Sequence, residues 1–220
     1  MEIRWFGQSF FEITTDTEVK KGVKIYIDPY ASIIGLEPPS NITADIALVT
    51  HQHPDHNNLK VFQDPGFVIE SAGEYSVAGV DVKGILAYHD TKSGEEYGTN
   101  IIYLLESEEI RLAHLGDLGH LLSDGQIQKI DGVDILLIPV GGNHSINGKE
   151  AVKTIKQLEP KVVIPMHYKI PGLKAPLNDL DSFCKEMGIC TSEPVPKLSL
   201  KKGSLEGKEM EVAVLKVNHE

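Results

Sequence analysis

The chain has no hydrophobic run that could cross a membrane and no visible export signal. None of the apolar stretches in its 220 residues approaches the roughly 18 residues that a membrane helix needs. Residues 1–7 begin an apolar strand pattern at once, without the basic and apolar segments of a signal peptide. We therefore expect a cytoplasmic protein with no membrane partner.

Basic residues and cysteines are also scarce. Asp and Glu number 32 and Lys and Arg 21, for a formal net charge of −11. Nucleic acids bind basic surfaces that displace their counterions, so we expect no nucleic-acid partner. The two cysteines, Cys184 and Cys190, form no Cys-x-x-Cys motif. We expect both to be small hydrophobic residues in or near a C-terminal helix, without a disulfide framework.

Length and composition are typical of one soluble domain that covers residues 1–220. Short apolar runs and apolar–polar alternation predict many strands, including one at 77–82, and a hairpin over 100–115. Helices are expected in four segments: 57–63, 123–130, 148–158 and 176–187. Strands in the majority with helices between them predict an α/β domain that has two sheets and helices outside.

The most informative segment is His51-Gln52-His53-Pro54-Asp55-His56, which carries three imidazoles and a carboxylate within six residues. The apolar run 46–49 precedes it and predicts a buried strand that ends at this cluster. Imidazole nitrogens and carboxylate oxygens suit zinc, iron or manganese. One small cation cannot easily take four ligands from so short a segment, but a sharp turn could direct them to two cations. The alternative is a His-rich surface loop, although compact His tracts usually bind metal.

Further candidate ligands stand at the ends of predicted strands or just after them: His89, His114, Asp117, His144 and His167. Binding sites gather at such strand ends. A lone His there is more often a hydrogen-bonded histidine than a ligand, but a metal cluster elsewhere in the chain needs partners. Asp117 could cap the turn after Gly116 or bridge two cations. His120 is a weaker candidate, and His219 is a tail residue.

With these residues in this order, the chain resembles the metallo-β-lactamase-fold hydrolases. The motifs that carry the resemblance are the 51–56 cluster, His89, Gly116-Asp117 and His167. Within this superfamily the chain resembles the branch that includes L-ascorbate-6-phosphate lactonase and N-acyl-phosphatidylethanolamine phospholipase D. The stretches that carry this resemblance are residues 5–10, 27–29, 114–117, 137–142 and 163–168. The resemblance covers roughly residues 1–170, and residues 171–220 carry no assigned motif.

The resemblance implies a four-layer αβ/βα sandwich, two mixed β-sheets flanked by helices, with a dinuclear metal site along one edge. Carried over by position, one ion would be bound by His51, His53 and His89. The other would be bound by Asp55, His56 and His167, and Asp117 would bridge the two. Two departures bear on substrate identity: Gln8 stands where this branch often has His, and His144-Ser145-Ile146 replaces an aromatic-Thr-Met sequence.

The expected function is that of a metal-dependent hydrolase, in which a hydroxide held by two divalent ions cleaves a small ester, lactone or phosphoester. Zinc is favoured, and manganese or iron would fit. Asp55 and Asp117 are the candidate catalytic carboxylates, and Asp55 could also accept or pass a proton. His144 and Gln8 are candidates for substrate contact or ligand support, and His114 for supporting Asp117.

Two other functions remain open at this point. One is a nucleic-acid phosphodiesterase of the same fold, which the acidic charge disfavours. The other is a non-catalytic metal-binding scaffold, which would show a closed coordination shell. A redox di-iron protein would need an attached electron-transfer module, for which the chain has no room. The expected partner is a small-molecule substrate, and homo-oligomerisation is left open.

Overall fold

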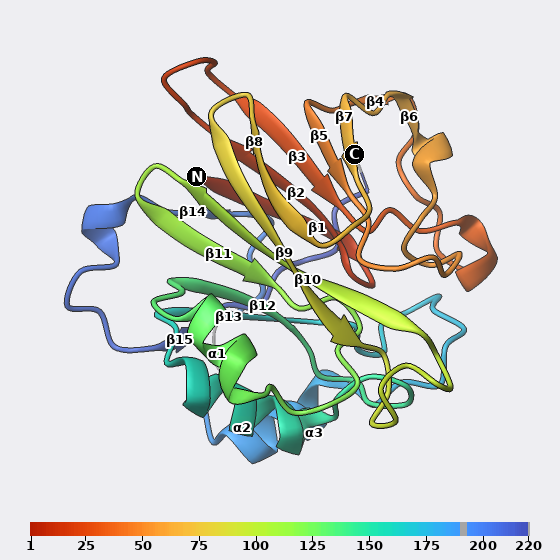
Figure 1. Ribbon diagram of the computed structural model, residues 1–220. Coiled ribbons are helices and arrows are strands. Elements are labelled where there is room, and N and C mark those ends of the chain that lie inside the picture. The colour runs from red at the N-terminus through yellow and green to blue at the C-terminus, as the bar shows by residue number, and fades with distance from the viewer. Residues whose placement is uncertain (190–192, 220) are drawn as a thin grey trace.

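The computed structural model describes residues 1–189 and 193–219, and two large mixed sheets dominate it (Figure 1). The first has the order β14-β1-β2-β3-β5-β7. Its strands are β1 (Glu2–Gly7), β2 (Phe10–Thr15), β3 (Val23–Ile27), β5 (Ile46–Leu48), β7 (Phe67–Ile69) and β14 (Leu198–Ser199). Side chains alternate along these strands, so that Trp5 and Phe11 face the core between the sheets while Phe6 and Phe10 face a second, smaller core.

The second sheet has the order β15-β13-β12-β11-β10-β9-β8. Its strands are β8 (Gly73–Val77), β9 (Val80–Tyr88), β10 (Thr99–Ser107), β11 (Ile110–His114), β12 (Ile135–Pro139), β13 (Val162–Met166) and β15 (Glu211–Val212). Every residue of β12 and β13 is buried, as a strand covered on both faces requires. A small third sheet pairs β4 (Ile42–Thr43) with β6 (Phe62–Asp64).

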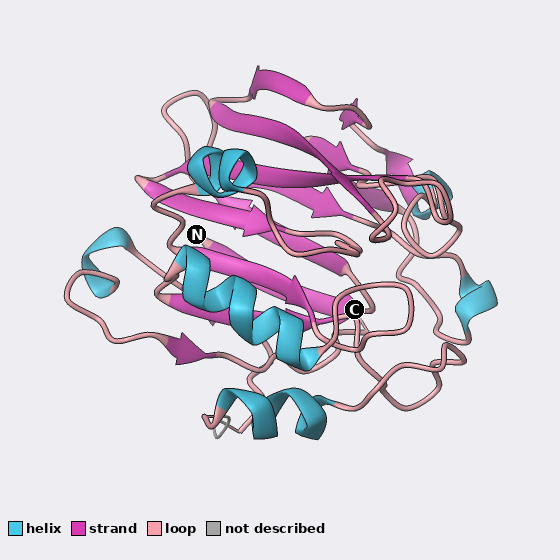
Figure 2. Cartoon of the chain, turned by 60° about the horizontal axis from the view of Figure 1, so that its bottom comes forward, coloured by secondary structure: helices cyan, strands magenta, loops and turns pink. Residues whose placement is uncertain are grey.

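The described α-helices are α1 (Asp124–Ile130), α2 (Gly148–Leu158) and α3 (Leu180–Met187), and they lie outside the second sheet (Figures 1 and 2). The apolar face of α2 is buried, and Asn147 and Glu150 form a capping box at its start. The outer face of the first sheet is covered instead by β4, β6 and two 3₁₀ turns, η1 (Ser32–Ile34) and η2 (Leu59–Val61). A third such turn, η3, spans Lys202–Ser204. Among the helices of the described ranges, none combines the length and hydrophobicity of a membrane crossing.

Strand direction brings the candidate ligands to one edge. Strands β11, β12 and β13 are parallel to one another, and β9 runs the same way because both β9 and β11 are antiparallel to β10. The C-terminal ends of β9, β11, β12 and β13 therefore lie at one edge of the second sheet. The first sheet contributes the segment that follows β5.

Some local predictions are wrong. Residues 77–82 do not form one strand: Val77 ends β8, Ala78 and Gly79 make the hairpin turn with φ values of 52° and 80°, and residues 80–82 begin β9. The helix expected at 57–63 is only the 3₁₀ turn η2, followed by β6. The last helix starts at residue 180, because the Asp179 side chain accepts a hydrogen bond from the Ser182 backbone N–H and caps it.

The cysteine expectation also needs correction. Cys184 lies in α3 and is half-buried, as expected for a small residue near the C-terminal helix. It is disulfide-bonded, so it does not act as a free hydrophobic thiol. Cys190 lies outside the described residues.

Candidate metal centre

The chain makes a tight turn after β5, and this turn divides the clustered ligands into two sets. The backbone N–H groups of His56 and Asn57 both donate to the carbonyl oxygen of His53, at 2.9 and 3.1 Å. This helical-type turn sends the side chains of His51 and His53 to one side and those of Asp55 and His56 to the other. The division that the sequence suggested is thus a consequence of local backbone geometry.

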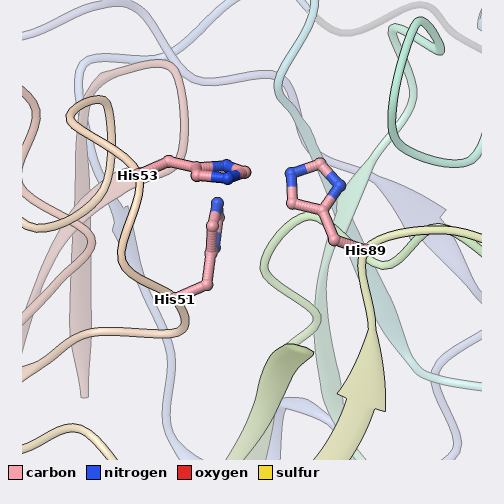
Figure 3. A group of neighbouring side chains, drawn as sticks. All are labelled: His51, His53 and His89. Atoms are coloured by element: carbon pink, nitrogen blue, oxygen red, sulfur yellow. The ribbon is translucent and has the colours of Figure 1, made fainter. Parts of the chain in front are cut away.

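Within the described residues, two groups of side chains could each hold a metal ion. The ligand atoms of each group lie within 4.8 Å of one another: His51, His53 and His89 in the first group, and Asp55, His56, Asp117 and His167 in the second. Figure 3 shows the first group, in which the two loop histidines meet His89 from the end of β9. Its ring centroids are 4.6, 4.8 and 5.0 Å apart.

Asp117 lies between the two groups. Its Oδ2 atom is 3.3 Å from Nε2 of His89 in the first group. The same atom is 3.3 Å from Nε2 of His56 and 3.1 Å from Nε2 of His167 in the second. A single carboxylate therefore reaches imidazoles of both groups, as a bridging ligand must.

Several buried polar atoms of this cluster are left unsatisfied. Nε2 of His51, Nε2 of His56 and Oδ1 of Asp117 form no hydrogen bond with any described residue. A buried polar atom without a partner costs on the order of 1–3 kcal/mol, and native proteins rarely tolerate several together. Cations at this position would satisfy these atoms, so the residues present fit a metal centre.

Four of the five ligand imidazoles, those of His51, His56, His89 and His167, have a polar neighbour at Nδ1. Thr50 Oγ1 donates to Asp28 and so must accept from Nδ1 of His51, at 2.9 Å. Nδ1 of His56 donates to the Asp28 carboxylate at 2.9 Å. Nδ1 of His89 donates to the backbone oxygen of His144 at 3.2 Å.

His167 follows the same pattern, because its Nδ1 lies 3.4 Å from a Ser145 hydroxyl that donates to the oxygen of Gly142. The proton of each of these rings is thereby placed on Nδ1. When such a ring is neutral, its Nε2 atom therefore carries the lone pair that faces the centre, which is the tautomer that metal binding requires.

The protonation of the cluster depends on burial and on neighbouring charge. Burial and the adjacent His56 lower the pKa of His51, and burial lowers the pKa of His53, so both are neutral at pH 7. Burial opposes charge on His56 too, but the carboxylates of Asp117, Asp55 and Asp28 raise its pKa well above the ordinary value. Burial disfavours charge on Asp117, yet His167 and His56 lower its pKa well below the usual value. A divalent cation would displace the protons that these carboxylates attract.

The structure also locates the candidate residues that were expected to support the ligands or to be weaker ligands themselves. His114 accepts from the Gly116 N–H through Nδ1 at 3.1 Å and donates from Nε2 to the Ser9 oxygen at 3.0 Å. It therefore supports the turn that carries Asp117. Gln8 is buried and donates from Nε2 to Asp55 Oδ2 at 3.0 Å. His120 and His219 belong to neither ligand group.

Sequence reasoning missed Asp28 as a site residue. Its carboxylate is fully buried and accepts from the backbone N–H of Thr50, the hydroxyl of Thr50 and Nδ1 of His56. Its φ of 55° is left-handed, a strained conformation that often marks a functional site. The available signal was an acidic residue at the end of a predicted strand, immediately before Pro29.

A cavity of about 380 Å³ adjoins the metal centre. We call it the side pocket; its wall includes Asp90, Thr91, Tyr97, Asn143, His144 and Ser145. His144 is exposed, and its ring lies 4.2 Å from that of Tyr97 between centroids. The side pocket gives a substrate room beside the ligand groups.

The chain is similar to several known proteins. Residues 2–167 match the family model of the beta-lactamase superfamily domain, a range that includes both ligand groups. The UPF0173 metal-dependent hydrolase of Methanopyrus kandleri is 26% identical over 220 residues, covering 86% of this chain and 94% of the relative. A UPF0173 metal-dependent hydrolase of Staphylothermus marinus is 30% identical over 192 residues, covering 76% of this chain and 82% of the relative.

The crystal structure of a metallo-beta-lactamase superfamily protein from Thermotoga maritima is also similar. It is 36% identical to this chain, and the match covers 98% of both chains with a TM-score of 0.75. The likeness therefore extends through both large sheets and the segments at their shared edge.

Proposed function

Because this chain belongs to the metallo-β-lactamase superfamily and resembles its UPF0173 metal-dependent hydrolases, we propose that it is a hydrolase that holds two divalent cations and cleaves a small ester, lactone or phosphoester. The expected metallo-β-lactamase fold is confirmed. Membership of the branch with the lactonase and phospholipase D stays a prediction.

The position of Asp117 carries this proposal. Its Oδ2 lies within 3.3 Å of Nε2 atoms from both ligand groups. In the proposed arrangement His51, His53 and His89 hold one ion, Asp55, His56 and His167 hold the other, and Asp117 is shared. A set this rich in imidazole favours zinc, with manganese and iron as alternatives.

When bound, a pair of divalent ions supplies Lewis acidity to the attacked carbonyl or phosphoryl group and lowers the pKa of water toward neutrality. The protein's contribution is to hold the ligands rigidly and to move a proton. The Asp55 side chain is 27% exposed, whereas that of Asp117 is 3% exposed. Gln8 donates a hydrogen bond to Oδ2 of Asp55. We therefore assign proton transfer to the other oxygen, Oδ1, of this more exposed carboxylate.

The other two functions are less well supported. The net charge of −11 disfavours nucleic acid as the substrate. A scaffold role would need no exposed carboxylate and no adjoining cavity, and both are present here. A small-molecule substrate therefore remains the proposed partner.

The test combines metal content with activity. Elemental analysis of the purified protein should find close to two metal ions per chain, and a panel of esters, lactones and phosphoesters should reveal hydrolysis. His53→Ala and Asp117→Ala should each lose both metal and activity. His219→Ala, which removes an exposed tail histidine, is the matched control and should lose neither. A metal-free protein with unchanged hydrolysis would refute the proposal.

A further inference from the structure

The described wall of the side pocket is acidic. Among the described residues that line it there is neither lysine nor arginine, while Asp90, Glu96 and Glu150 all contribute to the wall. A phosphate or carboxylate on the distal part of a substrate would find no lysine or arginine partner in this described wall. The pocket wall therefore discriminates between substrates by charge.

The side pocket borders the metal centre, because residues of its wall contact residues of both ligand groups. The His144 backbone oxygen accepts from Nδ1 of His89, and the Tyr97 ring centroid is 5.7 Å from that of His89. The hydroxyl oxygen of Ser145 lies 3.4 Å from Nδ1 of His167. Because His89 and His167 belong to different ligand groups, a substrate reacting between the groups would extend its remaining atoms into this pocket.

The acidic groups are fixed in place. The Asp90 carboxylate accepts from the backbone N–H groups of Lys92, Gly94, Glu96 and Tyr97. Asp90 thus holds the loop that carries Tyr97, and its carboxylate is fixed in the pocket wall.

The remaining acidic groups already have partners. Glu96 accepts from Lys92, the lysine of the same loop, and Glu150 accepts from the backbone N–H of Asn147. Lys92 is therefore already paired with a carboxylate and is not a free cation for a ligand.

Other polar groups in the pocket wall are free to bind a ligand. Within the part of the chain that the structure describes, the side chains of Thr91, Tyr97, Asn143 and His144 form no hydrogen bond, and all four are exposed. They offer hydroxyl, amide and imidazole groups that can both donate and accept. The Tyr97 and His144 rings add an aromatic surface for the C–H face of a ring.

We propose that the substrate is a polyhydroxylated ester or lactone whose non-reacting part is uncharged, and not a phosphorylated or carboxylated analogue. The proposal rests on the proposed function and specifies its substrate class. An anion placed among these carboxylates would be repelled, whereas hydroxyl groups match the free donors and acceptors.

The test uses two ligands that differ only at the distal end. D-gluconate and 6-phospho-D-gluconate share a carboxylate and a hydroxylated chain, and their binding to the metal-loaded protein can be measured by calorimetry. We expect gluconate to bind at least tenfold more tightly. The same ratio is expected in kcat/KM for D-glucono-δ-lactone against its 6-phosphate. Equal or tighter binding of the phosphorylated compound would overturn the proposal, as would no binding of either.

A variant that adds a positive charge to the pocket wall sharpens the test. Thr91→Lys places a cation in the pocket wall and should shift the preference at least tenfold toward the phosphorylated ligand. Thr43→Lys, at an exposed position on β4, adds the same charge elsewhere and should leave the ratio unchanged. An unchanged ratio in Thr91→Lys, with a melting temperature like that of the wild type, would count against the assignment.

A second variant does not depend on added charge. Asn143 has a φ of 66°, so Asn143→Gly keeps the backbone while removing the amide. We expect gluconate affinity to fall several-fold, and an unchanged affinity would contradict the assignment.

Failure of this proposal is distinguishable from failure of the proposed function. Metal content near two per chain and hydrolysis of 4-nitrophenyl acetate that is lost in His53→Ala would support the function independently of the charge preference.

Discussion

Asp28 is expected to control the tautomers of two histidines of the candidate metal centre at once, and Asp28→Asn tests this. Oδ1 of Asp28 accepts from the Thr50 N–H at 2.8 Å. Oδ2 accepts from the Thr50 hydroxyl at 2.7 Å and from Nδ1 of His56 at 2.9 Å. The change to asparagine keeps the shape but replaces one acceptor with an NH₂ donor.

Either orientation of the asparagine is unfavourable. With NH₂ in the place of Oδ2, the Nδ1 atom of His56 must accept, so its proton moves to Nε2. The hydroxyl of Thr50 then accepts from the amide and donates to His51, whose Nε2 is protonated in turn. With NH₂ in the place of Oδ1, the buried Thr50 N–H loses its acceptor at a cost of about 1–3 kcal/mol.

The expected loss follows from these alternatives. Groups that orient metal ligands typically contribute 10–100-fold in metal affinity, or about 1.4–2.8 kcal/mol. Because His51 and His56 belong to different ligand groups, we expect zinc affinity to fall by this factor in both. A competition titration with a chromophoric chelator measures the affinity, and long-range ¹H–¹⁵N correlation spectra of the imidazoles report the tautomers.

The control is Asp81→Asn, the same chemical change at an exposed position of β9, which should match the wild type. Zinc affinity of Asp28→Asn within twofold of the wild type, together with unchanged tautomers of His51 and His56, would refute the reasoning.

Two further predictions concern pH and the core. Burial lowers the pKa values of His56 and His89, but nearby carboxylates outweigh it and raise both. Because a cation must displace these protons, metal affinity should rise between pH 6 and pH 8 in titrations at fixed ionic strength. A metal affinity that does not depend on pH would contradict this prediction. Leu136→Ala removes a fully buried side chain of β12 and should lower the free energy of unfolding by about 2–5 kcal/mol in urea denaturation. Leu86→Ala, at a side chain that is 49% exposed, should lower the free energy of unfolding far less.

Much of the candidate metal centre could be predicted from the sequence because its principal element is local. The 51–56 cluster is contiguous, and the turn that divides it is made by its own backbone. His89, Asp117 and His167 were recognisable because strand ends can be predicted from apolar runs. The helix at residues 148–158 was predicted with correct bounds, since its apolar spacing and its cap are both local signals.

The failures have a different origin. Residues 77–82 carry the apolar–polar alternation of a strand, but the positive φ values of Ala78 and Gly79 make a hairpin turn there. The periodicity of side chains does not report φ, so the pattern was consistent with both structures. The helix expected at 57–63 failed because Phe62 pairs with Ile42 of a strand far back in the sequence.

The sequence alone determined which side chains could bind metal and that they stand where strands end, since ligand chemistry and strand periodicity are properties of short segments. Only the tertiary structure decided which of them meet. Asp28 reaches Thr50 and His56 because β3 and β5 pair in parallel, and the side pocket exists because the loop held by Asp90 packs against His144. Such proximities are set by sheet pairing and packing between distant segments, which no local pattern encodes.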